Sequence, residues 1–353
     1  MLAPGSAHAW VASMETSLVA IDACAWPVLV RLSPARLGMV YFNKPSHGLE
    51  EGDLVGLVSD DDGHSWQSAG TVACHDPGAN RMHIAAGVDH AGGWVVLSTG
   101  MRVVNGEHRG LDPVWCSTAA RETMKWNVRR DVAVPGTADR VIPHGRILAL
   151  PDGRLAATFY RSLGRGRPSH AWIAFSTDGG ATWGHPSLIG GGDANEVVLL
   201  RQVDGTLLAA ARTHVDHHVA LHASADGGET WGFRSDLTLP MQHPADLSDL
   251  GERGILLSYG IRNRGLMGIG ARLSRDGGLT WSAPVVLTQL GEATDCGYPS
   301  TQMCTDGALL TACYSDLSAL RRGYHLLTLR WTLDEFFAPR KLRSISDGGP
   351  LKA

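Results

Sequence analysis

Long apolar runs and strong charge of either sign are both absent from this sequence. No stretch of the 353 residues is apolar over the length that a membrane-spanning helix needs, and the first 22 residues lack the basic flank and continuous apolar core of a secretory signal. The net charge is −4 and only 19% of the residues are charged, so neither nucleic acid nor a membrane is expected as a partner. Small molecules and neutral polymers are therefore the expected partners.

Paired cysteine spacing is absent as well. The chain contains no Cys-x-x-Cys motif, and its six cysteines lie far apart, at Cys24, Cys74, Cys116, Cys296, Cys304 and Cys313. This pattern predicts buried free thiols in a reducing compartment, and therefore a cytoplasmic protein. No metal and no cofactor are expected. Disulfides, a metal site, and a secreted domain whose leader is missing from the chain are the alternatives.

Helical periodicity is almost absent, and its best candidate is the short segment 332–337, TLDEFF. The chain also has no linker, charged tail or low-complexity segment that would divide it. We therefore expect a single domain over residues 1–353, built from strands. Its repeating units are expected from about residue 8 to 338, with a C-terminal tail at 339–353.

One short motif occurs four times. The pattern Ser-x-Asp-x-Gly-x-Thr/Ser-Trp, called the box below, begins at Ser59, Ser176, Ser224 and Ser274. The last two intervals are 48 and 50 residues but the first is 117, which predicts a degenerate copy between Ser117 and Trp126. Asp and Gly favour a tight turn and Trp packs well between sheets, so the box is expected to stabilise the fold rather than to react.

A second marker lies between the boxes. Sequences such as ALPDGRLAATFY and RQVDGTLLAAAR place a turn between β-prone segments, and six such turns recur at roughly 50 to 60 residues. This period suits a four-stranded blade, so we predict an all-β protein, a six-bladed β-propeller of antiparallel blades. Segment 8–21 is expected to supply the outer strand of the last blade and close the ring. A β-helix or a double sandwich is the alternative fold.

The predicted inner strands begin with polar and aromatic residues. In a propeller these strands line the central channel, whose mouth faces a ligand. A purely structural channel would be filled at lower cost by small apolar residues, so the polarity favours function. The predicted strand starts are Ala25-Trp26-Pro27, Arg81-Met82-His83, Pro143-His144-Gly145-Arg146, Asn195-Glu196, His243-Pro244 and Gly297-Tyr298-Pro299.

The boxes and the six units resemble the sialidase (neuraminidase) superfamily over nearly the whole chain. A sharper similarity lies in NEVVLLRQVDGTLLAAARTH at 195–214, where a glutamate opens an inner strand and an arginine closes the next one. The resemblance places Glu196 and Arg212 at those positions. In CGYPSTQMCTDGALLTACY at 296–314, it places Tyr298 at the position of the catalytic nucleophile.

A Tyr and Glu pair has a chemical rationale. A phenol has a pKa near ~10, so it attacks well only when a base removes its proton. A neutral Tyr also approaches an anomeric carbon that carries a carboxylate with less repulsion than Asp or Glu would. The resemblance therefore implies Tyr298 as nucleophile and Glu196 as its base. The structural alternatives are a locally satisfied strand tyrosine and a channel salt bridge between Glu196 and Arg212.

The carboxylate clamp departs from the family pattern. Sialidases hold the sugar carboxylate with three arginines, whose planar guanidinium groups match it bidentately. Arg212 matches the second of them, but the first position reads Ala25-Trp26-Pro27 and has no arginine. Arg264, two residues before the matching place, is expected to supply the third, with Arg262 further off. Arg146 and Arg161 of the third blade are the alternative substitutes.

The general acid is expected in the first-blade loop at 43–53, NKPSHGLEEGD. The resemblance implies an acidic residue there, and Glu50 stands nearest the matching place, with Glu51, Asp53 and His47 as rivals. Histidine suggests a second chemistry, because the chain has 16 of them and His83 and His144 begin inner strands. The segment 213–218, THVDHH, is a weak candidate for a metal site.

Together these observations predict a sialidase-like exo-glycoside hydrolase that removes a terminal acidic sugar, sialic acid or a related 2-keto sugar acid. Its partner would be a glycan or a small sugar-acid substrate. One alternative is a related propeller glycosidase or polysaccharide lyase of different specificity, with His83 or His144 as acid or base; the arginine missing at Ala25 favours it. Another is a non-catalytic carbohydrate-binding propeller.

Overall fold

Antiparallel strands make up almost all of the regular structure. A computed structural model describes residues 14–137, 140–161, 169–291 and 293–337. Its one α-helix in these ranges, α1 (Leu333–Phe337), falls on the predicted segment TLDEFF. No helix of the described part of the chain is long and apolar enough to cross a membrane. Residues 8–13, predicted to begin the ring, and the predicted tail at 339–353 lie outside the described residues.

Four of the sheets are separate four-stranded blades. Blade 1 consists of β2 (Val28–Ser33), β3 (Arg36–Phe42), β4 (Leu54–Ser59) and β5 (Gln67–Ala73). Blade 4 consists of β16 (Asn195–Arg201), β17 (Leu207–Arg212), β18 (Val219–Ser224) and β19 (Gly232–Asp236). Blade 5 consists of β20 (Gln242–Asp249), β21 (Ile255–Asn263), β22 (Leu266–Ser274) and β23 (Val285–Gln289). Blade 6 consists of β24 (Gly297–Met303), β25 (Leu309–Leu317), β26 (Arg322–Trp331) and β1 (Glu15–Ile21).

The other two units share one eight-stranded sheet, so the prediction of six separate blades is wrong at this point. Unit 2 contributes β6 (His83–Val88), β7 (Trp94–Thr99), β10 (Trp115–Ala119) and β11 (Trp126–Arg129). Unit 3 contributes β12 (Ile142–Ala149), β13 (Leu155–Arg161), β14 (His170–Ser176) and β15 (Gly184–Ile189). The units join because β6 and β12 pair in parallel, and only a residue without Cβ fits at Gly87, where a Cβ would lie 2.1 Å from the Ile147 carbonyl oxygen.

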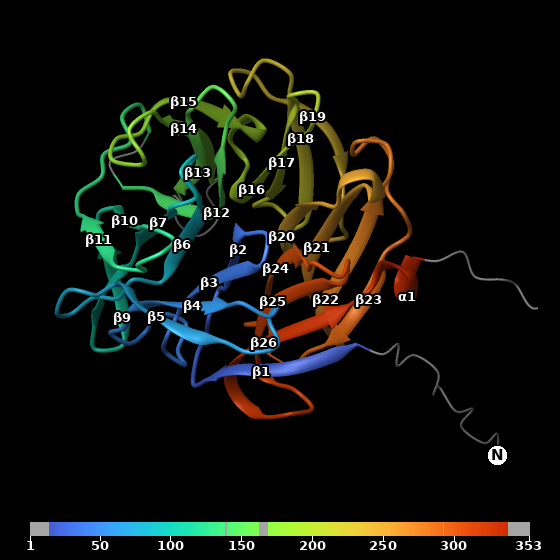
Figure 1. The fold of residues 1–353 in the computed structure, drawn as a ribbon, viewed down its shortest axis with the longest axis horizontal. Helices are drawn as coiled ribbons and strands as arrows, with labels where there is room; N and C mark the ends of the chain where they lie inside the picture. The colour runs from blue at the N-terminus through green and yellow to red at the C-terminus, as the bar shows by residue number, and fades with distance from the viewer. Residues whose placement is uncertain (1–13, 138–139, 162–168, 292, 338–353) are drawn as a thin grey trace, which may run out of the picture.

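Each unit runs from the centre of the molecule outwards. Figure 1 shows β2, β6, β12, β16, β20 and β24 around the middle of the molecule, with β5, β11, β15, β19, β23 and β1 at its edge. The remaining short elements lie in connections. They are the hairpin of β8 (Met101–Val104) and β9 (Glu107–Leu111) and the 3-10 turns η1 (Gly190–Gly192) and η2 (Gly251–Arg253).

The N-terminal strand closes the ring, as predicted. In Figure 1 the blue strand β1 lies beside the red strand β26, and the two pair antiparallel from Glu15 opposite Arg330 to Ile21 opposite His325. Blade 6 is thus completed by a strand from the other end of the chain. Because β1 covers the outer side of β26, β1 becomes the outer edge strand of blade 6, as β5, β19 and β23 are in the other separate blades.

The boxes fold as self-contained turns. In the second box the Ser176 hydroxyl donates to Asp178 at 2.8 Å and accepts the Gly180 N–H at 2.9 Å, while the Thr182 N–H donates to Asp178 at 2.8 Å. Equivalent bonds recur in the other three boxes. At Ser117 the degenerate copy has lost them, since this buried hydroxyl has no hydrogen-bond partner in the described structure. The structural interpretation of the box is therefore confirmed.

Box tryptophans pack between neighbouring units, which is the predicted arrangement. Trp183 of unit 3 lies in one apolar cluster with Ala85 and Val95 of unit 2. Trp231 of blade 4 packs on a cluster containing Phe175 of unit 3, and Trp281 of blade 5 on one containing Leu221 of blade 4. The repeated motif thus fixes each unit against the one before it.

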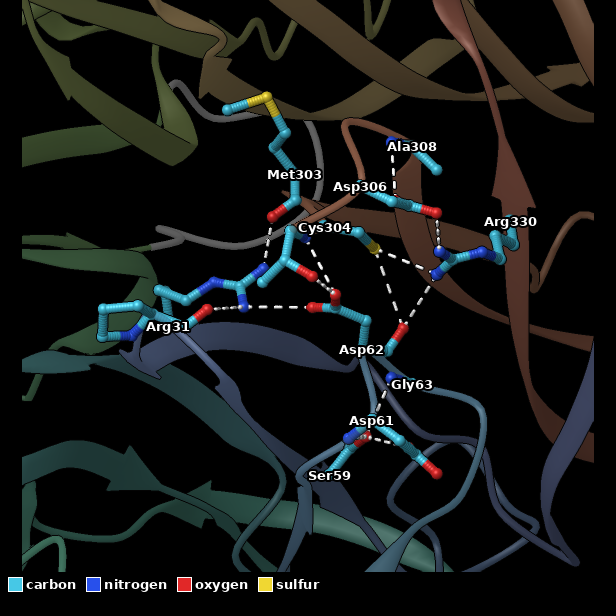
Figure 2. Close-up of polar contacts among 12 residues, drawn as sticks. Arg31, Ser59, Asp61, Asp62, Gly63, Met303, Cys304, Asp306, Ala308 and Arg330 are labelled. Carbon is cyan, nitrogen blue, oxygen red and sulfur yellow. Dashed lines mark hydrogen bonds and ion pairs between the residues drawn. The ribbon is translucent and has the colours of Figure 1, made fainter.

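The first box also fastens the two ends of the ring (Figure 2). Asp62 replaces the glycine of the other boxes, with a φ of 55° where Gly179, Gly227 and Gly277 have 71° to 75°. Its carboxylate accepts the Thr305 N–H of blade 6 at 2.8 Å and pairs with Arg31 at 3.3 Å. Its backbone oxygen accepts a hydrogen bond of 3.0 Å from Arg330.

We expect Asp62→Gly to lower the free energy of unfolding by about 1 to 3 kcal/mol, because the half-buried Arg31 and the Thr305 N–H lose a charged partner while the backbone keeps its conformation. Asp60→Ala is the matched control, since it removes only an exposed ion pair with Arg36. Urea unfolding of both variants measures the difference. Equal stability of the two variants would contradict the role given to Asp62.

Candidate active site

A cavity of about 290 Å³ lies where the inner strands begin. All six inner strands contribute to its wall, as predicted from their first residues, and four side chains from other elements complete it. The inner strands and the residues just before them contribute Trp26, Pro27, Val28, Met82, His83, Ile84, His144, Gly145, Arg146, Glu196, Val198, Pro244, Ala245, Asp246, Tyr298, Pro299 and Ser300, and the other four side chains are His47, Tyr160, Arg212 and Arg262.

Left-handed backbone conformations place the key side chains in this wall. Trp26, Glu196 and Tyr298 have φ values of 41°, 37° and 49°, which are uncommon for residues with a Cβ. At Glu196 and Tyr298 the strand pairing is irregular, with register shifts between Asn195 and Val197 and between Gly297 and Ser300. Such a bulge turns a side chain away from the ordinary strand alternation, at a conformational cost of about 1 kcal/mol or more.

Tyr298, Glu196 and Arg212 form a hydrogen-bonded chain. The Tyr298 hydroxyl donates to Glu196 Oε1 at 2.5 Å, and Arg212 Nη1 donates to Glu196 Oε2 at 2.7 Å. Glu196 is buried, and Arg212 has a side-chain exposure of 19%. The structure therefore brings together the three residues on which the sequence hypothesis depends.

The pKa shifts of Tyr298 and Glu196 define the protonation state of this hydrogen-bonded group. Burial, reinforced by the negative charge of Glu196, raises the pKa of Tyr298 far above its ordinary value, so the phenol is neutral. Burial alone would also raise the pKa of Glu196. The positive charge of Arg212 outweighs this effect of burial and lowers the pKa of Glu196. His144, His243 and the Tyr298 hydrogen bond lower it further by smaller amounts. The pair thus consists of a phenol whose proton already points at an ionised carboxylate.

Two arginines of the cavity wall have a guanidinium donor that no group of the described structure satisfies. The buried Nε atoms of Arg212 and Arg262 both lack a hydrogen-bond partner. Arg262 donates from Nη2 to the Cys296 carbonyl at 3.0 Å, and its guanidinium carbon lies 5.3 Å from the centre of the Tyr298 ring. Since buried donors are normally paired, unpaired guanidinium groups in a cavity wall favour an anionic ligand.

Arg264, the predicted third clamp residue, is not brought to the cavity. In the β21 to β22 hairpin Asn263 pairs with Leu266, which leaves Arg264 exposed in the two-residue turn. Arg262, two residues earlier on the same strand face, lines the cavity instead. The sequence shows both arginines, but the length of the hairpin decides which of them reaches the cavity.

The remaining arginine positions differ from those of a three-arginine clamp. At the first-blade position Ala25 is buried and offers no guanidinium, and the buried ring of the next residue, Trp26, lines the wall. Arg146 does reach the cavity, but Asp246 binds its guanidinium bidentately at 2.9 and 2.6 Å, and the Thr301 carbonyl accepts a further hydrogen bond at 2.6 Å. Arg146 therefore ties unit 3 to blades 5 and 6, and two arginines are left to face an anion.

His83 and His144 both line the cavity, as expected. The ring of His144 meets that of Tyr298 edge-on, with 6.3 Å between the ring centres. Burial lowers the pKa of His83 to about 3 and also lowers that of His144. Both imidazoles are therefore neutral at pH 7 and can donate or accept one hydrogen bond at each nitrogen, without acting as acids there.

The first-blade loop presents a histidine to the cavity rather than a carboxylate. Glu50 is exposed and does not belong to the cavity wall. The carboxylates of Glu51 and Asp53 lie 3.3 and 2.6 Å from the ring nitrogens of His75, away from the wall. Of Glu50 and its three rivals in this loop, His47 alone lines the cavity.

All six cysteines are free thiols, and they differ from the prediction only in that Cys74 is exposed. Within the described residues one group of side chains has the arrangement of possible metal ligands, namely Cys24, His47 and Asp295, whose ligand atoms lie within 4.8 Å of one another. Two tyrosine hydroxyls already donate to the Asp295 carboxylate, those of Tyr314 and Tyr324. The segment THVDHH does not form such a group.

A family model described as BNR repeat-like domain matches residues 88–310, more than half of the chain. No curated protein matches the sequence at a significant level. Among solved structures, a protein of unknown function from Dyadobacter fermentans is 17% identical, with a TM-score of 0.75 over 91% of this chain and 99% of that one.

Several similar structures are sialidases. A Hadza microbial sialidase is 18% identical, with a TM-score of 0.69 over 90% of this chain and 66% of the sialidase. Trypanosoma rangeli sialidase, solved as a covalent intermediate with 2,3-difluorosialic acid, is 14% identical, with a TM-score of 0.65 over 91% of this chain and 58% of its own. The chain thus spans between about half and two thirds of these sialidases. At such identities the likeness shows the fold: an all-β propeller of the sialidase type.

Proposed function

The chain belongs to the family of BNR repeat-like domains and has the sialidase fold, and from this we propose that it is an exo-acting glycoside hydrolase for a terminal acidic sugar. The proposed substrate is a glycoside of a 2-keto sugar acid such as sialic acid. Tyr298 would be the nucleophile, Glu196 its base, and Arg212 with Arg262 the clamp for the sugar carboxylate.

The observation that carries this proposal is the short chain of contacts at the cavity wall. A buried neutral phenol donates at 2.5 Å to a carboxylate that is already ionised, beside two guanidinium groups with unpaired donors. A tyrosine kept only for packing would not need an ionised carboxylate in a buried position, because burying that charge costs free energy. The arrangement suits a nucleophile activated by an adjacent base.

The chemistry would proceed in two displacements. The Tyr298 oxygen attacks the anomeric carbon while its proton passes to Glu196, and the glycosidic bond breaks as the leaving oxygen takes a proton from an acid. Water then attacks the same carbon and returns a proton to the acid, the bond to Tyr298 breaks, and the phenol recovers its proton from Glu196. Each half inverts the anomeric centre, so the sugar would be released with retained configuration.

A second substrate class is favoured by one observation: Ala25 stands where a three-arginine clamp would have its first arginine, and the indole of the next residue, Trp26, forms that part of the wall. An apolar wall and two arginines also suit a sugar whose carboxylate lies away from the anomeric carbon, such as a uronic acid. In that case the protein would be a glycosidase specific for uronic acids, with the same cavity as its active site. His83 is a poor general acid for such chemistry because burial lowers its pKa to about 3.

We expect the purified protein to release 4-methylumbelliferone from the α-glycosides of sialic acid or of a related 2-keto sugar acid. Glucuronides, galacturonides and rhamnosides complete the panel, and NMR of the first product gives its configuration. The carboxyl-reduced glycoside is the matched control, because it keeps the sugar but removes the anion that the arginines would bind. Turnover of uronides alone would select the second class. No turnover of any acidic glycoside, or turnover of the reduced control at an equal rate, would refute the proposal.

A further inference from the structure

We propose that His47, oriented by Asp295, is the proton donor and acceptor of this site, in the place where the family pattern suggested a loop carboxylate. The inference rests on the proposed function, and it assigns the acid that the two displacements need. Its basis is the position of His47 in the cavity wall and the fixed hydrogen bond behind its ring.

Asp295 fixes one side of the His47 ring. Its Oδ1 lies 3.0 Å from His47 Nδ1, and its Oδ2 accepts the Tyr324 hydroxyl at 2.8 Å. The Tyr314 hydroxyl donates to Oδ1, and the Cys24 thiol lies 3.6 Å from Oδ2. A carboxylate held by this many donors stays ionised, and it requires the proton on Nδ1 of the imidazole. Asp295 is therefore a positioning residue for the ring.

The other side of the ring is left for a substrate. No hydrogen bond to His47 Nε2 exists among the described residues, whereas Nδ1 is taken by Asp295. The ring meets Trp26 edge-on with 4.9 Å between their centres, and Trp26 in turn meets Tyr298 with 6.2 Å between theirs. His47 and Tyr298 thus line one cavity and contact the same indole, that of Trp26. In the described structure the Nε2 atom of His47 is free to form a hydrogen bond with a substrate.

Other candidates in the described part of the cavity wall do not fit this role. The carboxylates of Glu196 and Asp246 are each engaged by an arginine. His83 and His144 have lowered pKa values, so neither carries a proton to give at neutral pH. An imidazole beside an ionised carboxylate, half exposed to water, is the group in this wall that can exchange a proton in both displacements.

With His47 in this role, every proton of the two displacements has a donor and an acceptor. In the first displacement the Tyr298 oxygen forms its bond to the anomeric carbon, the electron pair of the glycosidic bond passes to the leaving oxygen, and that oxygen takes the Nε2 proton. The imidazole is then neutral. In the second displacement it takes a proton from the attacking water as the bond to Tyr298 breaks, and the protonated ring is restored.

Leaving-group dependence tests this assignment. A general acid matters when the leaving oxygen is basic and matters little when it is a good leaving group. We expect His47→Ala to lower kcat/KM for an alkyl glycoside by about 10² to 10⁴-fold, but for a 4-nitrophenyl glycoside by less than about 10-fold. Added azide should speed turnover of the aryl glycoside by His47→Ala, because a small anion that needs no base replaces the water. It should not speed the wild type.

Rescue by the conservative variant tests the positioning by Asp295. The groups that face His47 and its carboxylate are Asp295, Cys24, Tyr314, Tyr324 and His83. Asp295→Asn removes the anion that holds the proton on Nδ1 and orients the ring, so kcat/KM should fall for the alkyl glycoside and change little for the aryl glycoside. Asp295→Glu should restore part of the loss on the alkyl glycoside, which a merely structural role would not predict.

Controls separate this inference from the proposed function. Leu49→Ala, an exposed change in the same loop, should leave both substrates unaffected. If His47→Ala does not fold in a thermal melt, His47→Gln, which keeps a donor toward Asp295, carries the same test. Equal losses on both glycosides, no loss, the same signature in Glu50→Ala instead, or zinc-dependent recovery after chelation would overturn the role of His47. A wild type inactive on every glycoside would refute the proposed function itself.

Discussion

Tyr298→Phe is expected to reduce kcat by a factor of about 10³ or more on every substrate that the wild type hydrolyses. The change removes one oxygen atom, which is the atom that would attack the anomeric carbon and which now donates to Glu196 at 2.5 Å. The phenyl ring keeps its contacts with Trp26 and Tyr314, at 6.2 and 5.9 Å between ring centres. The fold and KM should therefore change far less than kcat.

Stopped-assay kinetics with the best substrate of the panel measure this effect. Tyr41→Phe is the matched control, because it removes a partly buried tyrosine hydroxyl of blade 1 outside the cavity wall. Its kcat should equal that of the wild type within about twofold. If Tyr298→Phe retained more than a tenth of wild-type kcat, Tyr298 would not be the nucleophile, and the ionised Glu196 would have to be considered in its place.

Arg212→Leu should have the second-largest effect, a loss of about 10² to 10³-fold in kcat/KM with a changed pH profile. Arg212 lies 2.7 Å from Glu196 and lowers the pKa of that carboxyl against the effect of burial. Without the arginine, burial raises the pKa of Glu196, so the base is protonated at higher pH. The acid limb of kcat/KM should accordingly move upward in the variant, and activity should be lost at acidic pH values that the wild type tolerates.

The lysine variant separates the two roles of this arginine. Arg212→Lys keeps a positive charge near Glu196 but loses the planar guanidinium that binds a carboxylate bidentately. Its acid limb should stay near that of the wild type while KM rises. Arg275→Leu, an exposed arginine in the last box, is the control for loss of one positive charge. An unchanged acid limb in Arg212→Leu would contradict the electrostatic role.

The scaffold could be predicted from sequence because its signals are local and repeated. Each box closes hydrogen bonds within a few residues, so the pattern around Ser176 and Asp178 needs no distant partner to be recognised. Regular spacing then located the inner strands, and with them Glu196 and Tyr298. The fusion of units 2 and 3 was missed, because it depends on how closely Gly87 approaches Ile147, a contact between segments 60 residues apart.

The details of the site depend on contacts that spacing does not encode. Whether Arg262 or Arg264 faces the cavity is decided by where the β21 to β22 hairpin turns. In the loop at 43–53, the choice between Glu50 and His47 is decided by Asp295, about 250 residues away in sequence. The left-handed conformations of Glu196 and Tyr298 were not foreseen either, since neither residue type favours positive φ.

The unusual backbone at the start of the inner strands has a consequence for how such a protein can change over evolutionary time. Trp26, Glu196 and Tyr298 occupy corresponding places in three blades, and each presents its side chain to the same cavity while the boxes that hold the blades together lie elsewhere. A substitution at one such place alters one face of the pocket and leaves the box turns of every blade intact. A change of specificity therefore needs a substitution in one blade only, while the scaffold that the boxes hold together stays as it is.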